Sequence, residues 1–172
     1  MVHATLESAL DGVDILLLVS TGHVPNRVRQ HKAVIDAAER TGVERIVYTS
    51  VLQADKSKMG LAADHLATEQ LLAAAPLHST LLRDSWYLQL YTEDLPGTIK
   101  RGMTIGSAGD GPVSALLAAG LTEDDADMIV DSDQAIPRGE LETASHDLSR
   151  LLRRPTKSVT EFLTDRLHSD GQ

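Results

Sequence analysis

A strand, a helix and a second strand within the first 50 residues constrain the fold most strongly. Val13–Val19 is a nearly continuous apolar run of strand length, which is typical of a parallel sheet covered by helices on both faces. Residues 26–41 have the spacing of an amphipathic helix with a left-handed cap at Gly42, and Arg45–Ser50 follows as a strand rich in β-branched residues. Because such crossovers are right-handed and join parallel strands, the sequence predicts an α/β fold.

The alternation continues once more and then stops. Residues 63–75 predict a helix that ends near Pro76, and residues 78–87 predict a third strand that ends around Arg83. A helix broken at Pro96 and a short strand within residues 103–112 are expected next. The remaining segments are expected to be helical, with Thr122 as one N-cap and a capping box at Ser158 and Glu161; they are residues 113–120, 122–133, 140–155 and 158–169.

Composition excludes several classes of function. A net charge of -9 argues against nucleic-acid binding, which needs clustered Lys and Arg, and we interpret the basic residues 150–157 as a solvated helix end. The chain has no cysteine, so disulfides, thiolate metal sites and a cysteine nucleophile are excluded. No apolar run approaches the roughly 20 residues of a membrane span. We therefore expect a cytoplasmic protein without membrane or nucleic-acid partners.

Polar residues follow each predicted strand, where ligands of open parallel sheets bind. Small hydroxyl residues at the first two strand ends leave room for a flat ligand and can hydrogen-bond ribose or amide groups, although Ser and Thr are equally common where a strand meets a turn. The candidate binding residues are Ser20, Thr21, Thr49, Ser50, Arg83, Asp84, Trp86 and Tyr87.

Several segments, in order and at close spacing, resemble the type 2 NAD(P)H:quinone oxidoreductases, which belong to the NmrA-like, atypical short-chain dehydrogenases. The segments are VDILLLVST, HKAVIDAAERTGVERIVYTSVLQAD, LAADHLATEQLL, TLLRDSWY and IGSAGDGP, followed near the end by ADMIVDSD, GELE and LSRLLRRPTKSVTEFL. The resemblance covers nearly the whole chain. It implies a Rossmann-like fold that binds NADP or NAD and transfers hydride to a quinone.

The chain departs from that family in two places. The glycine-rich G-x-x-G-x-x-G turn that holds the pyrophosphate has no counterpart, and DILLLV (Asp14–Val19) resembles the family's fourth strand. After Gly111, the family's further strands are also lacking. The resemblance thus implies a truncated NAD(P)-binding domain of about three to four strands in residues 1–111 and a helical subdomain packed on it in residues 112–172. We expect a second copy or a partner chain to cover the exposed sheet edge.

The resemblance also indicates catalytic residues. Where standard short-chain dehydrogenases carry a Tyr and a Lys one helical turn apart, this chain has His65 and Glu69. His65 is then a candidate proton donor to a quinone oxygen, oriented by Glu69. The alternative is a surface His–Glu pair at helical spacing. A metal half-site is disfavoured because no further ligands cluster nearby in the sequence.

The segment LRDSWY departs from the family pattern, which usually has Asn and Gly after the Arg. Asp84 and Ser85 stand there instead, and an anion beside a nicotinamide favours its oxidised, positively charged form. Trp86 and Tyr87 either flank the nicotinamide or pack against a following helix. Two functions remain open: an NAD(P)H-dependent quinone oxidoreductase, and a non-enzymatic NmrA-like regulator or remnant that senses dinucleotides or binds protein partners.

Overall fold

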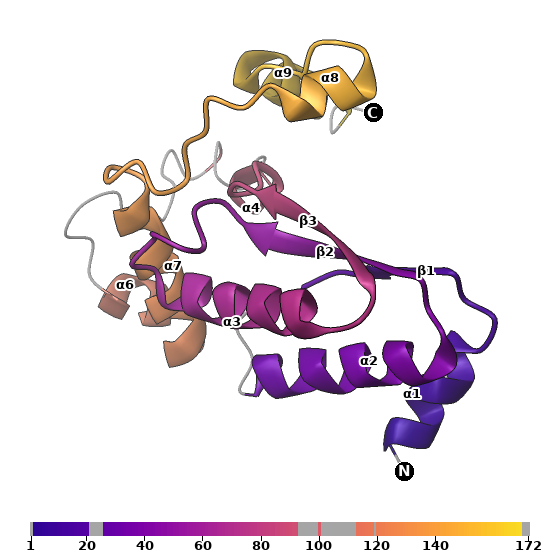
Figure 1. Ribbon diagram of the computed structural model, residues 1–172. Coiled ribbons are helices and arrows are strands. Elements are labelled where there is room, and N and C mark those ends of the chain that lie inside the picture. Colours follow the sequence, from indigo (N-terminus) through magenta and orange to yellow (C-terminus); the bar gives the residue numbers. More distant parts are fainter. Residues whose placement is uncertain (1, 21–25, 93–99, 101–112, 119, 170–172) are drawn as a thin grey trace.

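A three-stranded parallel sheet forms the centre of the protein (Figure 1). The structure is a computed structural model that describes residues 2–20, 26–92, 100, 113–118 and 120–169. The strands are β1 (Ile15–Leu18), β2 (Arg45–Val51) and β3 (His78–Asp84), in the spatial order β1-β2-β3. In the register, Leu17 lies beside Val47, which lies beside Thr80. The predicted α/β class and parallel pairing are confirmed.

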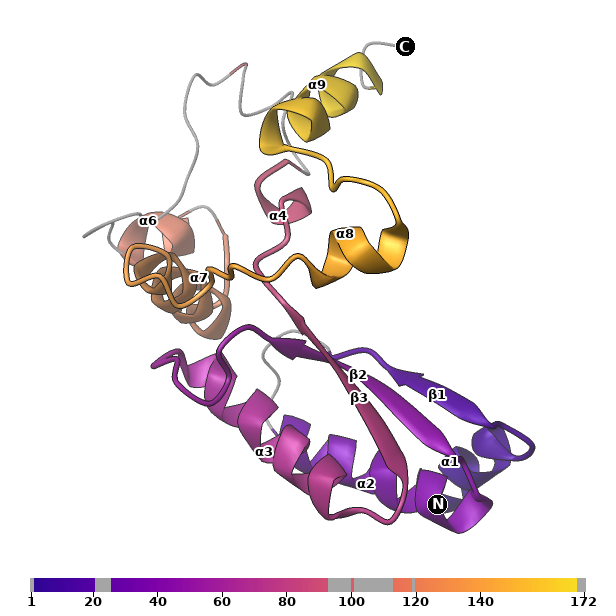
Figure 2. The same cartoon turned by 45° about the horizontal axis from the view of Figure 1, so that its top comes forward.

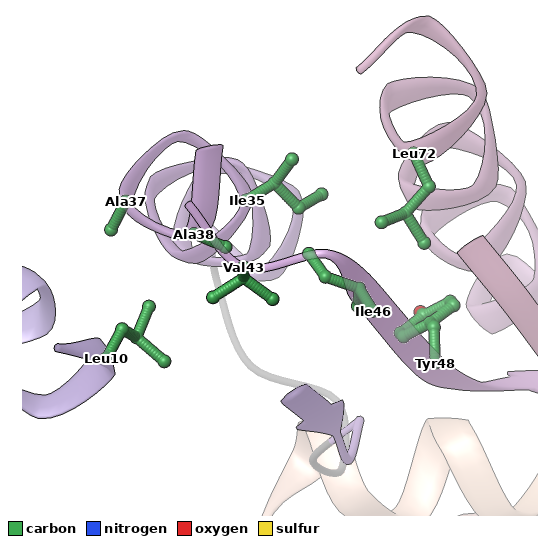
Figure 3. Packing of buried hydrophobic residues seen from close by; sticks show 8 residues of the cluster. All are labelled: Leu10, Ile35, Ala37, Ala38, Val43, Ile46, Tyr48 and Leu72. Carbon is green, nitrogen blue, oxygen red and sulfur yellow. The ribbon is translucent and has the colours of Figure 1, made fainter. Parts of the chain in front are cut away.

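Helices α2 (Arg27–Thr41) and α3 (Gly60–Ala74) cover one face of this sheet, and α1 (Val2–Leu10), which the sequence analysis did not anticipate, packs against α2 (Figures 1 and 2). Helix α2 ends at Gly42, whose φ of 81° is the predicted left-handed cap. The main core lies between these helices and β2 (Figure 3) and consists of Leu10, Ile35, Ala37, Ala38, Val43, Ile46, Tyr48 and Leu72.

The opposite face of the sheet is open in the described part of the chain. Ile15, Leu17 and Val19 are 62%, 57% and 59% exposed, whereas Leu16 and Leu18 pack against the core. The prediction of helices on both faces is therefore wrong for these residues. Because the strands advance in one direction across the sheet, both right-handed crossovers place their helices on the same side.

The C-terminal part is helical, as predicted, but its helices differ in packing. They are α4 (Gln89–Thr92), α6 (Val113–Ala118), α7 (Glu123–Ala135), α8 (Asp147–Leu152) and α9 (Val159–Ser169). Helix α7 contacts α3, whereas α8 has no buried residue. The helix expected over residues 140–155 forms only within α8. The predicted break at Pro96 and the strand within residues 103–112 lie outside the described residues.

Two of the predicted helix caps are confirmed. The Thr122 side chain accepts a hydrogen bond from the Asp125 amide at the start of α7. Before α9, the Ser158 amide donates to the Glu161 carboxylate at 2.7 Å, and the Glu161 amide donates to Ser158 Oγ at 3.2 Å. None of the described helices is both long and apolar enough to cross a membrane.

Candidate functional site

A pair of hydroxyl side chains marks the carboxyl ends of β1 and β2. The Ser20 amide donates to Thr49 Oγ1 at 2.7 Å, and the two hydroxyl oxygens lie 3.2 Å apart, within hydrogen-bonding distance. Both residues are half-buried. The structure thus brings together two of the predicted binding residues. Thr21, which was predicted to join them, lies outside the described residues.

A second group of predicted residues converges on one carboxylate. Arg83 at the end of β3 binds Glu69 of α3 through two hydrogen bonds, Nε to Oε1 at 2.9 Å and Nη2 to Oε2 at 2.6 Å. Ser50 donates to the same carboxylate at 2.6 Å. Asp55, which the sequence analysis did not single out, accepts from Arg83 Nη1 at 2.8 Å. This network ties the ends of β2 and β3 to α3.

The charges of this network are matched. Burial alone would raise the pKa of Glu69, but the hydrogen bonds from Arg83 and Ser50 together hold it below its ordinary value. The hydrogen bond to Glu69 in turn raises the pKa of Arg83. Glu69 is therefore an anion at neutral pH whose oxygens already accept bonds from the chain itself.

His65 has a different partner from the one predicted. Its Nδ1 and the Tyr48 hydroxyl share a 2.8 Å hydrogen bond beneath β2, where the ring is 4% exposed. The Glu69 carboxylate, one turn further along α3, bonds Ser50 and Arg83. The alternative of a surface His–Glu pair is wrong, because both side chains are buried. Tyr48 is a core residue, and its hydroxyl is hydrogen-bonded.

Burial keeps this pair neutral. It lowers the pKa of His65 to about 4, with the nearby Arg27 and His31 adding to the effect, and it raises the pKa of Tyr48 to about 12. At pH 7 both side chains are therefore neutral, and a single hydrogen bond joins them. The role of His65 as a proton donor stays a prediction. Because burial keeps the His65 ring neutral at pH 7, the ring would have to take up a proton before it could act as a charged donor.

Sequence reasoning did not anticipate that polar residues of α2 are buried. His31 is buried between the helices, and its Nδ1 lies 3.0 Å from Thr68 Oγ1 on α3. Arg27 is 1% exposed. Both stand at four-residue spacing before Ile35, so the helical period could have assigned them to the buried face. Because Arg and His are usually exposed, the two residues were not assigned to that face.

The aromatic residues after β3 are separated. Trp86 packs against the apolar cluster that joins the carboxyl end of the sheet to α7, a cluster made of Val51, Ala54, Met59, Ala62, Ala135 and Leu141. Tyr87 is 54% exposed, and its hydroxyl donates to Asp84 at 3.0 Å. Among the described residues, no group of three or more His, Asp or Glu side chains is placed to hold a metal ion.

Known proteins share this fold and parts of this sequence. The family described as NAD(P)H-binding matches residues 1–115, so the chain belongs to that family. It is 46% identical over 116 residues to quinone oxidoreductase 2 of Escherichia coli, a match that covers 67% of this chain and 41% of that protein. It is 34% identical over 92 residues to an NmrA-like family domain-containing oxidoreductase of Aspergillus flavus, 49% of this chain and 30% of the other.

Solved structures confirm the Rossmann-like fold. An NADPH-dependent quinone oxidoreductase of Escherichia coli in complex with NADPH superposes with a TM-score of 0.85 at 31% identity, covering 95% of this chain and 80% of the other. A Citrobacter triphenylmethane reductase gives a TM-score of 0.84 at 23% identity, with the same two shares, and supports the fold alone. The resemblance found in the sequence is thereby confirmed, and the chain spans less than half of the curated relatives that it matches.

The two halves of a nicotinamide dinucleotide fit this chain unequally. The hydroxyl pair at Ser20 and Thr49 is the kind of donor and acceptor set that ribose and carboxamide groups need. For the pyrophosphate, the sequence has no G-x-x-G-x-x-G turn at a helix start. The described residues therefore suit the nicotinamide half.

Proposed function

We propose that the chain binds the nicotinamide and ribose of NADPH or NADH at the carboxyl edge of its sheet and serves quinone reduction. The membership of residues 1–115 in the NAD(P)H-binding family carries the proposal. The similarity to quinone oxidoreductase 2 supports the substrate class. When bound, the cofactor supplies the hydride, and the chain's own residues bind and orient it.

The polar residues divide these tasks. Ser20 and Thr49 hydrogen-bond the ribose or the carboxamide. Arg83 forms ion pairs with Glu69 and with Asp55. Because these charged groups already bind one another, their role is to hold the strand ends in place. Asp84 and Tyr87 border the site after β3. His65 stays the candidate proton donor, with Tyr48 as its hydrogen-bonding partner.

Titration with NADPH and NADH tests the proposal directly. Trp86 is the only tryptophan of the chain and lies beside the proposed site, so bound reduced nicotinamide should quench its fluorescence. We expect saturable binding that Thr49→Val weakens, because the methyl group cannot replace the hydroxyl. The conservative Thr41→Val, at the far end of α2, is the matched control. Absence of binding up to millimolar cofactor would contradict the proposal.

Asp84 offers a charge test at the same site. Replacing it by Asn removes an anion that attracts the positively charged oxidised nicotinamide, so we expect Asp84→Asn to bind the oxidised cofactor about fivefold more weakly, as the loss of roughly 1 kcal/mol of attraction between charges near a protein surface predicts. The reduced nicotinamide is uncharged, so its affinity should change less. Asp36→Asn on α2 makes the same chemical change away from the site and should leave the affinity unchanged. Equal affinities for Asp84→Asn and the unchanged chain would remove Asp84 from the site.

In the non-enzymatic alternative, the chain is an NmrA-like protein that senses dinucleotides or binds protein partners. This alternative predicts that the dinucleotide binds, or a protein partner binds, while quinones are not reduced. Measuring NADPH oxidation with a panel of quinones under saturating cofactor separates the two functions. Binding without turnover would favour a sensor, whereas turnover that Thr49→Val lowers would favour the enzyme.

A further inference from the structure

A buried hydrogen bond joins β2 to α3. Tyr48 is 0% exposed and His65 is 4% exposed, and the Tyr48 hydroxyl oxygen lies 2.8 Å from Nδ1 of His65. A buried hydroxyl needs an acceptor for its hydrogen. Because a phenol is a stronger acid than the N–H group of a neutral imidazole, and an imidazole nitrogen is a stronger base than a hydroxyl oxygen, Tyr48 donates to Nδ1. The one hydrogen of the neutral His65 ring therefore lies on Nε2.

The Nε2 atom is the open end of this pair. No described residue hydrogen-bonds Nε2 of His65, and the atom is not fully enclosed, although His65 as a whole is buried. The ring belongs to the second turn of α3, the helix that follows the carboxyl end of β2 along the chain. A neutral imidazole that presents an N–H group can donate to a substrate oxygen without first becoming charged.

A buried cation lies close to the other end of the pair. Arg27, the first residue of α2, is 1% exposed, although burial and the positive end of a helix both disfavour a cation there. Burial raises the pKa of Tyr48 to about 12, whereas the hydrogen bond with Thr68 and the charge of Arg27 lower it and the carboxylates of Glu69 and Asp64 raise it further. Arg27 thus supplies the positive charge that a Tyr48 phenolate would need.

We propose that Tyr48 is the proton source behind His65, which protonates a quinone oxygen from Nε2 while Tyr48 returns a proton to Nδ1 and Arg27 balances the phenolate. The inference rests on the proposed function, because it needs a quinone that has accepted hydride. It gives a role to a buried tyrosine and a buried arginine that the binding site leaves unused. Both act through His65, so they are positioning residues.

The transfer balances in protons and charge. Hydride from the cofactor leaves one oxygen of the quinone as an anion. The Nε2–H bond of His65 breaks as the O–H bond of the product forms, and the O–H bond of Tyr48 breaks as the Nδ1–H bond forms. The imidazole stays neutral, and the negative charge moves to the Tyr48 oxygen beside Arg27. After the product leaves, a proton from water binds Nε2 and the Nδ1 hydrogen returns to Tyr48.

Nitrogen NMR of the imidazole rings measures the hydrogen positions without cofactor or substrate. In the unchanged chain at neutral pH, we expect the His65 hydrogen on Nε2 and a bare, hydrogen-bonded Nδ1. Tyr48→Phe keeps the aromatic ring and removes the hydroxyl, so the Nδ1 signal should move toward that of a nitrogen without a hydrogen bond. His78, exposed at the start of β3, is the internal reference. A hydrogen on Nδ1 of His65 in the unchanged chain would overturn the proposal.

Single-turnover kinetics test the transfer itself. With NADPH bound and a quinone added, Tyr48→Phe should lower the rate constant about 100-fold and leave the affinity for NADPH unchanged. Ser132→Ala is the matched control, because it removes a buried hydroxyl that donates to Met128 O within α7. In mixtures of light and heavy water, the rate of the unchanged chain should fall along a curve, because two protons move together. The rate of Tyr48→Phe should fall along a straight line, a change that a purely structural role of Tyr48 would not cause.

The outcomes separate this inference from the proposed function. No oxidation of NADPH by any quinone in the unchanged chain would overturn the proposed function and this inference with it. Quinone reduction that Tyr48→Phe leaves as fast, or a straight-line dependence on heavy water in the unchanged chain, would overturn this inference alone. The NMR and heavy-water measurements on the unchanged chain decide the matter even where Tyr48→Phe fails to fold.

Discussion

At the scale of single residues, helix α3 and strand β2 meet with matching spacings. Tyr48 and Ser50 both face the helix and are two strand residues apart, about 6.6 Å. His65 and Glu69 are four helix residues apart, about 6 Å. Tyr48 therefore bonds His65 and Ser50 bonds Glu69, one pair above the other. The helical spacing of His65 and Glu69 was visible in the sequence, but the separate partners depend on the strand beneath them.

The neutral His65 makes the stability depend on pH. Its pKa of about 4 in the folded chain lies below the ordinary value of about 6.5, so the unfolded chain binds the additional proton between these values. The stabilisation is complete above about pH 6.5 and is lost as the pH falls through about 4. Urea unfolding at pH 7.5 and pH 4.5 should show a loss of up to about 3 kcal/mol from this group.

A variant isolates the contribution of His65 to that loss. His65→Gln keeps a hydrogen-bonding side chain but cannot titrate, so the unfolding free energy of this variant should fall less between the two pH values. His78→Gln, which replaces an exposed histidine at the start of β3, is the matched control. An identical slope in the unchanged chain and in His65→Gln would contradict the buried neutral ring.

At the scale of elements, the sequence predicted those features that depend on residues close together in the chain. The apolar strands, the cap at Gly42 and the capping box at Ser158 all formed as expected, because each depends on neighbouring residues. Which faces of the sheet the helices cover could not be predicted in this way. It depends on the order of the strands, which decides whether the two crossover helices lie on the same face. The burial of His31 was not predicted for a related reason, because its partner Thr68 lies on another helix.

The cap of α2 gives the element-scale prediction. Gly42→Ala should lower the unfolding free energy by about 1 kcal/mol, because an L side chain is strained at positive φ. A Cβ built at Gly42 meets nothing within 4 Å, so the cost comes from the backbone alone. Gly60→Ala, at the first residue of α3 with an ordinary 3.7 Å contact to Asp131, should be neutral or slightly stabilising in the same urea experiment. Equal losses in both variants would contradict this account.

At the scale of the whole molecule, burial is uneven. Ile46 and Tyr48 of β2 are fully buried, whereas α8 has no buried residue. Amide hydrogen exchange should therefore be slowest in β2 and fastest in α8 among the described elements, because protection follows burial and packing. Strong protection of α8, comparable with that of β2, would show that another surface covers it in solution.

The strand order has a consequence for how the chain folds during synthesis. Because β1, β2 and β3 are neighbours in space in the order in which they are made, β2 and β3 each find a partner strand already made. The first βαβ unit is complete once Val51 has left the ribosome, and β3 adds to its free edge. Among the described strands, none waits for a later one to be inserted between two others, so this part of the sheet can grow in the order in which translation supplies it.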